Sequence, residues 1–327
     1  MEKVILAVDV GGTNVRVAAV NLEGRVLQKM EFPTEASRGR ERVMEHILSS
    51  IHGILRRFPK EEFEVIGGGF GIPGAIDLDR GIISESPNLP GWEDFDIRAR
   101  LQEGLRIPVF IENDTNALAL GEGWLGAAMD VRDFCCLTLG TGVGGAIVFN
   151  GDIWHGAQGM AGEIGHMVID VDGPLCQCGR RGCLEAFASG SAIRRMAIEA
   201  IERHEKTDLV ERCGGEIEAI TSMTVYEGAR DGDGLSREIF RRMGTYLGVG
   251  LANLVNILNV ELVVIGGRVS AAWDFFVDAA KRELEERALG SMGKGVRVER
   301  ARCGDDAGIL GAAYLVKRDL ERRRGTR

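Results

Sequence analysis

Two segments far apart in the chain repeat one pattern: a hydrophobic strand, a glycine turn and a returning hydrophobic strand. The first runs from Val4 to Val20 around Gly11-Gly12, and the second runs from Phe134 to Phe149 around Gly140-Thr141-Gly142. An amphipathic helix and a further hydrophobic strand follow in each half. This recurrence indicates an internal duplication, and we predict one α/β layer for each half.

The length of the chain fits this division. A chain of 327 residues is longer than one hydrophobic core usually serves, so two lobes are expected. Contents of 45% hydrophobic and 27% charged residues are ordinary for a globular protein and argue against long disordered segments.

Glycine is the unusual residue of the composition. The chain has 46 glycines, about twice the usual share. They cluster at Gly11–Gly12, Gly67–Gly71, Gly140–Gly145 and Gly266–Gly267. Glycine has no side chain and lets the backbone approach a ligand closely. Turns alone would explain any one cluster, but four clusters favour ligand binding at the ends of strands.

Charge and hydropathy exclude several classes of partner. The formal net charge of −9 argues against nucleic acid or an anionic membrane as the main partner. The N-terminal apolar run is interrupted by Asp9, which does not fit a signal peptide, and the uncharged stretch from Phe134 to Asn150 is too short and too rich in glycine to span a bilayer. We therefore predict a cytoplasmic protein.

The segment from Asp9 to Asn14 fits a phosphate-binding turn between two strands. The backbone N–H groups of Gly11 and Gly12 can point at one anion, and Thr13 adds a hydroxyl. Asp9 at the strand end can hold Mg²⁺, directly or through water, as phosphoryl transfer requires. A simple hairpin turn would explain this segment if it stood alone.

The second glycine turn makes a phosphate site the better interpretation. Two facing turns, the first and Gly140-Thr141-Gly142, can hold a triphosphate from both sides. Gly266-Gly267 follows a hydrophobic strand and precedes a helix, so an adenosine can lie over bare backbone there. We predict that these segments bind ATP.

A carboxylate follows a predicted strand in Glu112-Asn113-Asp114 and opens a helix. Proteins of the α/β class place catalytic groups at this edge of the sheet. A helix N-cap is the structural alternative, and Asp114 can serve as both cap and base. An alcohol hydroxyl is a poor nucleophile, and a carboxylate within hydrogen-bond reach can take its proton as a phosphoryl group arrives.

One histidine and three cysteines lie close together in the sequence. They are His166, Cys176, Cys178 and Cys183. This set fits a closed tetrahedral zinc site with a structural role, whereas a lone cysteine is usually buried packing. Zinc would hold one ring nitrogen of His166 and leave the other for a substrate hydroxyl. Glu163 and Glu185 flank the cluster, and carboxylates accept hydrogen bonds from substrate hydroxyl groups well.

Seven motifs follow one another along the chain. They are Asp9-Val-Gly-Gly-Thr-Asn14, Ile72-Pro-Gly-Ala-Ile-Asp77, Asn88-Leu-Pro-Gly-Trp92, Glu112-Asn-Asp-Thr-Asn116, Leu139-Gly-Thr-Gly-Val-Gly-Gly145, Gly162-Glu-Ile-Gly-His166 and Cys176-x-Cys-Gly-x-x-Gly-Cys-Leu-Glu185. Together they resemble the ROK family (repressors, open reading frames and sugar kinases) over essentially the full chain. The cysteine motif is highly specific to that family.

The resemblance implies an α/β fold of the actin-like ATPase (ribonuclease H-like) type, with two α/β lobes around a cleft. In that fold the last helix, here at about residues 305–323, returns to the first lobe. We therefore assign residues 1–120 plus 305–327 to the N-terminal lobe. Residues 121–304 form the C-terminal lobe with its zinc-binding loop.

The resemblance also implies roles for individual residues. Asp114 is the implied general base, and His166, Cys176, Cys178 and Cys183 are the implied zinc ligands. The implied sugar contacts are Gly74, Asn88, Asn113, Asp114, Glu163, His166 and Glu185. The predicted contacts to ATP and Mg²⁺ are Asp9, Gly11, Gly12, Thr13, Asn14, Gly140, Thr141, Gly142, Gly266 and Gly267. The family precedent suggests a homodimer or homotetramer.

The family leaves several activities open. The stretches Glu112-Asn-Asp-x-Asn116-Ala and Asn88-Leu-Pro look most like bacterial glucokinases, which implies ATP-dependent conversion of glucose to glucose 6-phosphate. Kinases of N-acetylmannosamine and N-acetylglucosamine share the same catalytic elements, and fructokinases and allokinases also stay open. Sugar-responsive repressors resemble this chain plus a DNA-binding domain, for which a first strand at Val4 leaves no room. An activator ATPase with an iron–sulfur cluster is a third class, and His166 among the ligands speaks against it.

Overall fold

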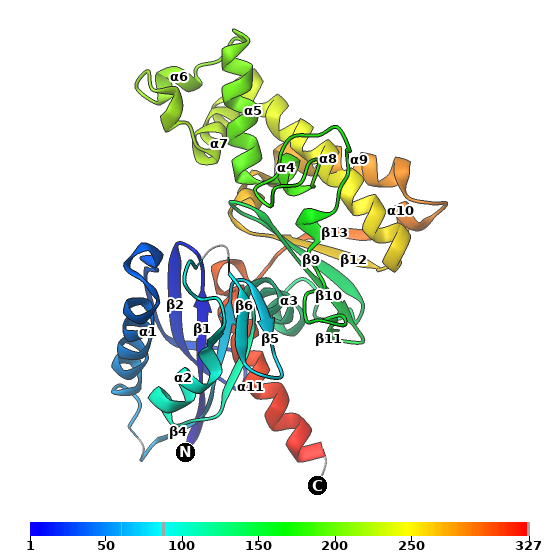
Figure 1. The fold of residues 1–327 in the computed structure, drawn as a ribbon. Helices are drawn as coiled ribbons and strands as arrows, with labels where there is room; N and C mark the ends of the chain where they lie inside the picture. Colours follow the sequence, from blue (N-terminus) through cyan, green and yellow to red (C-terminus); the bar gives the residue numbers. More distant parts are fainter. Residues whose placement is uncertain (60, 87–88, 326–327) are drawn as a thin grey trace. The chain divides into compact units, whose positions relative to one another are not determined.

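Two five-stranded sheets share one strand order (Figure 1). In this computed structural model, which describes residues 1–59, 61–86 and 89–325, the order is β3-β2-β1-β4-β8 in the first sheet and β11-β10-β9-β12-β13 in the second. Numbered within its own sheet, each reads 3-2-1-4-5. The shared order agrees with the predicted internal duplication.

The first sheet combines antiparallel and parallel pairs. Its strands are β1 (Glu2–Val10), β2 (Asn14–Asn21), β3 (Val26–Pro33), β4 (Phe63–Ile72) and β8 (Val109–Asn113). The pairs β1–β2 and β2–β3 are antiparallel, and the pairs β1–β4 and β4–β8 are parallel. A small sheet is formed by β5 (Ala75–Asp77), β6 (Ile82–Glu85) and β7 (Phe95–Asp96). The helices that accompany these strands are α1 (Arg40–Leu55), α2 (Ile97–Leu105), α3 (Asp114–Leu125) and α11 (Ala307–Gly325).

The second sheet consists of β9 (Phe134–Leu139), β10 (Val143–Phe149), β11 (Asp152–Ile153), β12 (Leu262–Gly266) and β13 (Arg297–Arg300). Its helices are α4 (Glu185–Ala188), α5 (Gly190–Glu202), α6 (Leu209–Arg212), α7 (Ser222–Asp231), α8 (Gly234–Leu258), α9 (Trp273–Arg287) and α10 (Met292–Gly295). Helix α8 has an apolar stripe at helical spacing, and seven of its residues are buried: Leu235, Ile239, Met243, Leu247, Leu251, Leu254 and Val255. Leu258, the last residue of the stripe, is partly exposed. Within the described residues, none of the helices has both the length and the apolar character that crossing a membrane needs.

Strand β1 is buried on both faces because helices cover both sides of its sheet. Val4, Leu6 and Val8 lie in one core cluster with residues of α1. The alternate residues Ile5 and Ala7 lie in another cluster with residues of α11. A continuous apolar run is typical of a strand covered on both sides, and Figure 1 shows α1 (blue) and α11 (red) flanking this sheet.

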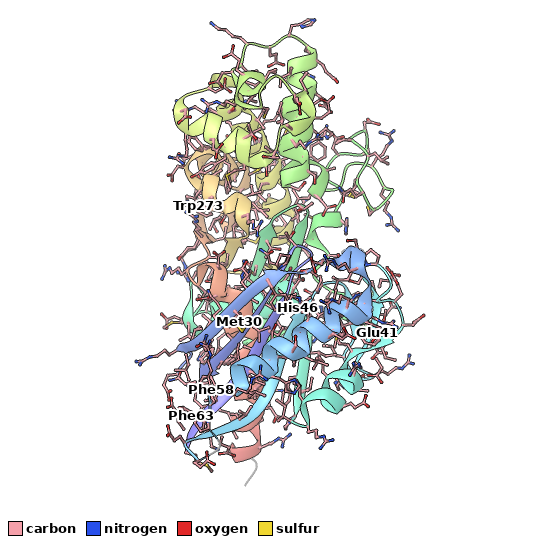
Figure 2. The ribbon with its side chains drawn as sticks, turned by 90° about the vertical axis from the view of Figure 1, so that its left-hand side faces the viewer. Met30, Glu41, His46, Phe58, Phe63 and Trp273 are labelled. Atoms are coloured by element: carbon pink, nitrogen blue, oxygen red, sulfur yellow. The ribbon has the colours of Figure 1, made fainter. Side chains whose placement is uncertain are left out.

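Helix α1 ends earlier than its apolar pattern predicts. Apolar residues recur at helical spacing from Val43 to Phe58, but the helix ends at Leu55 and the chain continues in a turn. Pro59 disfavours the helical conformation in the residue before it, which explains the early end. Aromatic contacts hold α1 and the turn after it against the sheet. His46, near the middle of α1, stacks on Phe32 of β3 at 4.0 Å between ring centroids. Phe58, in the turn, packs edge-on against Phe63 of β4 at 5.1 Å between ring centroids (Figure 2).

The glycine run Gly67–Gly71 lies inside strand β4. A Cβ atom on Gly69 would lie 1.8 Å from the carbonyl oxygen of Ala312, and one on Gly67 would lie 2.9 Å from Val316 Cγ1. Helix α11 therefore packs directly on the bare backbone of β4. The prediction that this cluster approaches a ligand is wrong for Gly67 and Gly69, because these glycines serve helix–sheet packing.

Backbone contacts divide the chain into two units. Unit 1 comprises Met1–Arg132, Ile147–Ala161 and Ala301–Arg327, and unit 2 comprises Asp133–Ala146 and Gly162–Arg300. Residues 121–132, 147–161 and 301–304 lie in unit 1, although the sequence-based division placed them in the second lobe. Part of the reason is that α3 continues to Leu125 and packs closely on α11.

The carboxylate of Glu122, near the end of α3, is completely buried and accepts three backbone hydrogen bonds. Its Oε2 accepts from the N–H groups of Ala127 (2.8 Å) and Arg302 (3.0 Å), and its Oε1 accepts from the N–H of Cys303 (2.8 Å). Ala127 lies on the segment by which the chain leaves unit 1, and Arg302 and Cys303 lie where it returns. Glu122 therefore fastens the outgoing and returning segments to each other inside unit 1.

Replacing Glu122 with Gln is expected to lower the free energy of unfolding by about 2 kcal/mol or more, because the new amide N–H₂ would face buried N–H donors and leave at least one unpaired. Urea denaturation of the purified protein measures this change. The control is Glu103→Gln on the exposed side of α2, where a change within about 0.5 kcal/mol is expected. Equal urea midpoints for Glu122→Gln and the wild type would contradict the role of Glu122 in fastening the two segments to each other.

Candidate active site and metal centre

The carboxyl ends of three parallel strands in unit 1 bring two predicted site residues to one edge. Asp9 of β1 pairs with Gly71 of β4, and Gly71 pairs with Glu112 of β8. A Cβ atom on Gly71 would lie 3.6 Å from the Cα of Asp114 and 3.9 Å from Oδ1 of Asp9. The predicted base and the predicted magnesium carboxylate thus lie on either side of the bare backbone of Gly71.

Asn113, and not Asp114, is the N-cap of α3. Its Oδ1 accepts from the N–H groups of Thr115 (2.9 Å) and Asn116 (3.2 Å). Asp114 is the first residue of the helix, and its Oδ1 accepts from the N–H of Thr115 at 2.8 Å. The prediction that Asp114 caps the helix is therefore wrong, because the side chain of Asn113 provides the cap. The prediction that Asp114 acts as the base is a separate matter and stays a prediction.

Asn113 also holds the loop that contains Gly74. Its Nδ2 donates to the carbonyl oxygen of Gly74 at 3.0 Å. Gly74 has a φ of 113°, and a Cβ atom there would lie 2.2 Å from the carbonyl oxygen of Glu85. This position therefore requires glycine. Two predicted sugar contacts, Gly74 and Asn113, thus touch each other, whereas Asn88 lies outside the described residues.

Two further residues of this edge were missed in the sequence. Glu112, only 3% exposed, accepts at Oε1 from the N–H of Asn113 and from Nδ2 of Asn116, both at 2.9 Å. Its Oε2 forms a 2.8 Å hydrogen bond with Nε2 of His155. This hydrogen bond raises the pKa of His155 above its ordinary value, although partial burial opposes the shift. Glu112 stood in a quoted motif without a role, and His155 carried no sequence signal.

Asp9 lies in a mostly buried ionic network at the start of α11. Its Oδ2 is 3.3 Å from Arg16, and a Cβ atom on Gly308 would lie 2.6 Å from its Cγ. Burial raises the pKa of Asp9 above its ordinary value, although the Arg16 guanidinium opposes the shift. The first turn of a helix favours a nearby carboxylate through its unpaired N–H groups, which adds to the stabilisation by Arg16.

The predicted phosphate turn after β1 has the expected hairpin geometry. The N–H of Gly11 donates to the carbonyl oxygen of Asn14 at 2.9 Å, and the hydroxyl of Thr34 donates to the carbonyl oxygen of Gly11 at 2.6 Å. Gly12 and Thr13 are exposed at the tip of the turn. The tip therefore presents backbone to solvent, as a phosphate-binding turn must.

The predicted ATP contacts of unit 2 come together at the ends of β9 and β12. Gly266 pairs with Thr138, and a Cβ atom on Gly267 (φ 83°) would lie 2.5 Å from the carbonyl oxygen of Leu139. The turn Gly140–Gly142 follows at once, closed by a hydrogen bond from the N–H of Gly140 to the carbonyl oxygen of Gly142 (2.9 Å). The start of α5 holds this turn, because the N–H of Gly190 donates to the carbonyl oxygen of Gly140 at 2.7 Å.

The four predicted zinc ligands converge in unit 2. The ligand atoms of His166, Cys176, Cys178 and Cys183 all lie within 4.8 Å of one another. The two sulfurs of Cys178 and Cys183 are 3.7 Å apart, and Sγ of Cys176 is 3.8 Å from Nδ1 of His166. A tetrahedral zinc ion with bonds of about 2.3 Å separates its sulfur ligands by about 3.8 Å. The donor set and its spacing therefore fit zinc.

The environment of the cluster favours a thiolate at one position and links the cluster to the predicted sugar contacts. A hydrogen bond from the backbone of Arg180 lowers the pKa of Cys178 to about 7. Glu185 accepts from the thiol of Cys176 at 3.4 Å and from the N–H of Val143, next to the glycine turn, at 3.0 Å. The Nδ1 atom of His166 faces the cysteines, whereas Nε2 lies 4.0 Å from Glu163.

The domain of the ROK family matches residues 5–319. The chain belongs to the ROK family. It is 39% identical over 316 residues to the glucokinase of Halalkalibacterium halodurans, an alignment that covers 95% of this chain and 94% of the relative. It is also 29% identical over 318 residues to the xylose repressor of Caldicellulosiruptor bescii, which covers 97% of this ROK protein and 78% of the repressor.

Solved ROK structures share the fold of this ROK protein. The crystal structure of a ROK family glucokinase from Streptomyces griseus, in complex with glucose and AMPPNP, matches with a TM-score of 0.84 and 30% identity. The match covers 96% of this chain and 99% of that chain. The actin-like ATPase fold predicted from the motifs is thereby confirmed, as is the resemblance to the family.

The predicted site residues fall into two groups, one in each unit. The group of unit 1 contains Asp9, Gly11, Gly12, Thr13, Asn14, Gly74, Asn113 and Asp114. The group of unit 2 contains Gly140, Thr141, Gly142, Glu163, His166, Glu185, Gly266, Gly267 and the cysteine ligands. Each group is joined internally by the contacts described above.

Proposed function

We propose that this ROK protein is an ATP-dependent hexose kinase that converts glucose to glucose 6-phosphate. One observation carries the proposal: Asp9 and Asp114 flank Gly71 at the carboxyl edge of one sheet. A sugar kinase needs two carboxylates there, one for the proton of the hydroxyl and one for the magnesium ion of ATP. The similarity to two ROK glucokinases, one in complex with glucose and AMPPNP, supports glucose as the acceptor.

In the proposed reaction Asp114 acts as the general base. The 6-hydroxyl oxygen of glucose attacks the γ-phosphorus, the bond from that phosphorus to the β–γ bridging oxygen breaks, and ADP leaves. The hydroxyl proton passes to the carboxylate of Asp114 and later to solvent. The capping amide of Asn113 fixes the first turn of α3 and so fixes the backbone that carries Asp114.

The glycine turns are assigned to ATP. We assign the phosphates to Gly11, Gly12, Thr13 and Asn14 in unit 1 and to Gly140, Thr141 and Gly142 in unit 2, and the adenosine to Gly266 and Gly267. Mg²⁺ would bring charge neutralisation to the phosphates. Asp9 would hold it through a water molecule, because Arg16 already pairs with Oδ2 of Asp9 at 3.3 Å and Mg²⁺ keeps several of its waters.

The sugar hydroxyls are assigned to polar groups of both units. In unit 1 these are Gly74, Asn88, Asn113 and Asp114, and in unit 2 they are Glu163, His166 and Glu185. Zinc, when bound, supplies a fixed anchor for Nδ1 of His166 and has a structural role. His166 would then present Nε2 to a hydroxyl group, with Glu163 at 4.0 Å from that nitrogen.

A panel of acceptors tests the proposal. The purified protein is assayed for ADP release from ATP with glucose, fructose, allose, N-acetylglucosamine and N-acetylmannosamine. We expect the highest kcat/KM for glucose. A higher kcat/KM for N-acetylglucosamine or N-acetylmannosamine would identify that sugar as the substrate instead of glucose. Glucose binding without ADP release from any sugar would refute the kinase and favour a sugar-responsive regulator.

The assembly and location follow as part of the same proposal. We propose a homodimer or homotetramer in the cytoplasm, where ATP is available as the donor. Light scattering coupled to size-exclusion chromatography measures the assembly, and a monomer at assay concentration would contradict it.

A further inference from the structure

Glu112 and His155 form a tie between the strand that carries the proposed base and a distant part of the chain. Their 2.8 Å hydrogen bond joins the end of β8 to the segment Ile147–Ala161, and both lie in unit 1. The Glu112 side chain is only 4% exposed, so its charge is shielded from water and needs partners. A buried carboxylate that spans two segments in this way restricts both of them.

At the end of β8, the carboxylate of Glu112 also holds the residues on either side of Asp114. Oε1 of Glu112 accepts from the N–H of Asn113 and from the side chain of Asn116, which is itself 5% exposed. Asn113 is the cap of α3, and Asn116 lies in its first turn. Asp114 therefore lies between two residues that the Glu112 carboxylate holds.

On the other side, the tie holds a closed loop. The carbonyl oxygen of His155 accepts from the N–H of Ala161 at 3.0 Å, which closes residues 155–161 into a loop. A Cβ atom on Gly159 in this loop would lie 3.1 Å from the carbonyl oxygen of Ile76 in β5, so the loop packs against unit 1. Ala161 is the last residue before the segment Gly162-Glu163 in the chain. His155 thus fixes the place from which the chain runs on to Glu163 and His166.

We propose that His155 and Glu112 are positioning residues of the kinase, which hold Asp114 and the segment leading to Glu163 in their working places. The inference rests on the proposed function, in which Asp114 takes the proton and Glu163 contacts the sugar. Neither positioning residue needs to touch substrate. Loss of the tie is expected to lower kcat through Asp114 and to raise the KM for glucose through Glu163.

The imidazole of His155 can exchange protons with solvent, so its hydrogen bond to Glu112 can respond to pH. The imidazole is 31% exposed and lines a cavity of about 420 Å³ in unit 1. The charged groups around it are Glu112 on β8, Asp152 on β11, Arg98 on α2, and Arg318, Asp319 and Arg322 on α11. Arg318 and Arg322 both form ion pairs with the carboxylate of Asp152, at 2.5 and 3.0 Å. His155 forms its hydrogen bond with the carboxylate of Glu112.

The hydrogen bond to Glu112 raises the pKa of His155 above 6.5 in the folded protein. The stability that protonated His155 contributes through this hydrogen bond is therefore fully present below pH 6.5. It is lost as the pH rises through the pKa of His155 in the folded protein. Above that pKa a neutral hydrogen bond remains, which is weaker than the charge-assisted one. The positioning effect should thus be strongest on the acidic side.

Three variants test the proposal: His155→Ala removes the tie, His155→Gln keeps an N–H donor without titration, and His52→Ala on the exposed side of α1 is the control. We expect His155→Ala to lower kcat/KM for glucose about tenfold, as the loss of one charge-assisted hydrogen bond would. The KM for ATP should stay unchanged. His155→Gln should restore most of the activity, and the ratio of wild-type to His155→Gln activity should fall as the pH rises from about 6 to about 8.5.

Amide hydrogen exchange provides a readout that does not depend on catalysis. We expect faster exchange in His155→Ala at residues 113–116 and 156–161, and wild-type exchange in the control. If the wild-type protein phosphorylates no hexose, the proposed function fails, and the exchange data alone decide whether the tie exists. Kinetic constants of folded His155→Ala within about twofold of wild type, or unchanged exchange in both segments, would overturn the inference.

Discussion

Replacing Asp114 with Asn is expected to lower kcat for glucose phosphorylation by about 10²- to 10⁴-fold, the usual contribution of a positioned general base. The amide has nearly the shape of the carboxylate but cannot accept the hydroxyl proton. The helix should be unaffected, since Asn113 is the cap and the side-chain oxygen of residue 114 can still accept from the N–H of Thr115. The KM values for glucose and ATP should therefore change little.

Steady-state kinetics and the thermal midpoint together check this expectation. The control is Asp130→Asn at an exposed position of unit 1, which should leave both quantities unchanged. If Asp114→Asn folds normally and keeps more than about a tenth of the wild-type kcat, Asp114 does not act as the base. A loss of stability with proportionate loss of activity would point to a structural role instead.

Replacing Cys178 with Ser is expected to remove most of the bound zinc and to destabilise unit 2 by about 3 kcal/mol or more, since structural zinc sites contribute directly to folding. Serine is a much poorer zinc ligand than the thiolate that the environment of Cys178 favours. The KM for glucose should rise as well, because loss of the metal would also release Cys176, another ligand of the same cluster. Cys176 contacts both His166 and Glu185, two proposed sugar contacts.

Metal analysis by plasma mass spectrometry and thermal unfolding measure these effects. Cys213→Ser is the matched control, since Cys213 is also partly buried in unit 2 but lies outside the cluster. It should keep the wild-type zinc content. Wild-type protein purified without chelators that contains no zinc would show that the cluster has another role.

Much of the fold could be predicted because its strands have strong local patterns. Strand β1 is apolar on both faces and therefore reads as a continuous run, and the two glycine turns repeat in both halves. The cluster of one histidine and three cysteines could be predicted for a similar reason. Three of the four lie within one short segment, so their spacing was visible without any tertiary structure.

The remaining features depend on contacts between distant segments. Gly67 and Gly69 are small because α11 packs on them, and α11 comes from the other end of the chain. Glu122 binds residues 302 and 303, and His155 binds Glu112, so neither role can be read from a local pattern. The choice of Asn113 as the cap over Asp114 was a local question, but both residue types suit a cap, and composition could not distinguish them.

The fate of a labelled phosphoryl group tests the central claim most directly. The protein is incubated with glucose and ATP that carries ¹⁸O on its γ-phosphoryl group, and the products are measured by mass spectrometry. We predict labelled glucose 6-phosphate and unlabelled ADP in equal amounts from the wild type, and at least about a hundredfold less of both products from Asp114→Asn in the same time. Label that appears in inorganic phosphate without any sugar phosphate would contradict the account.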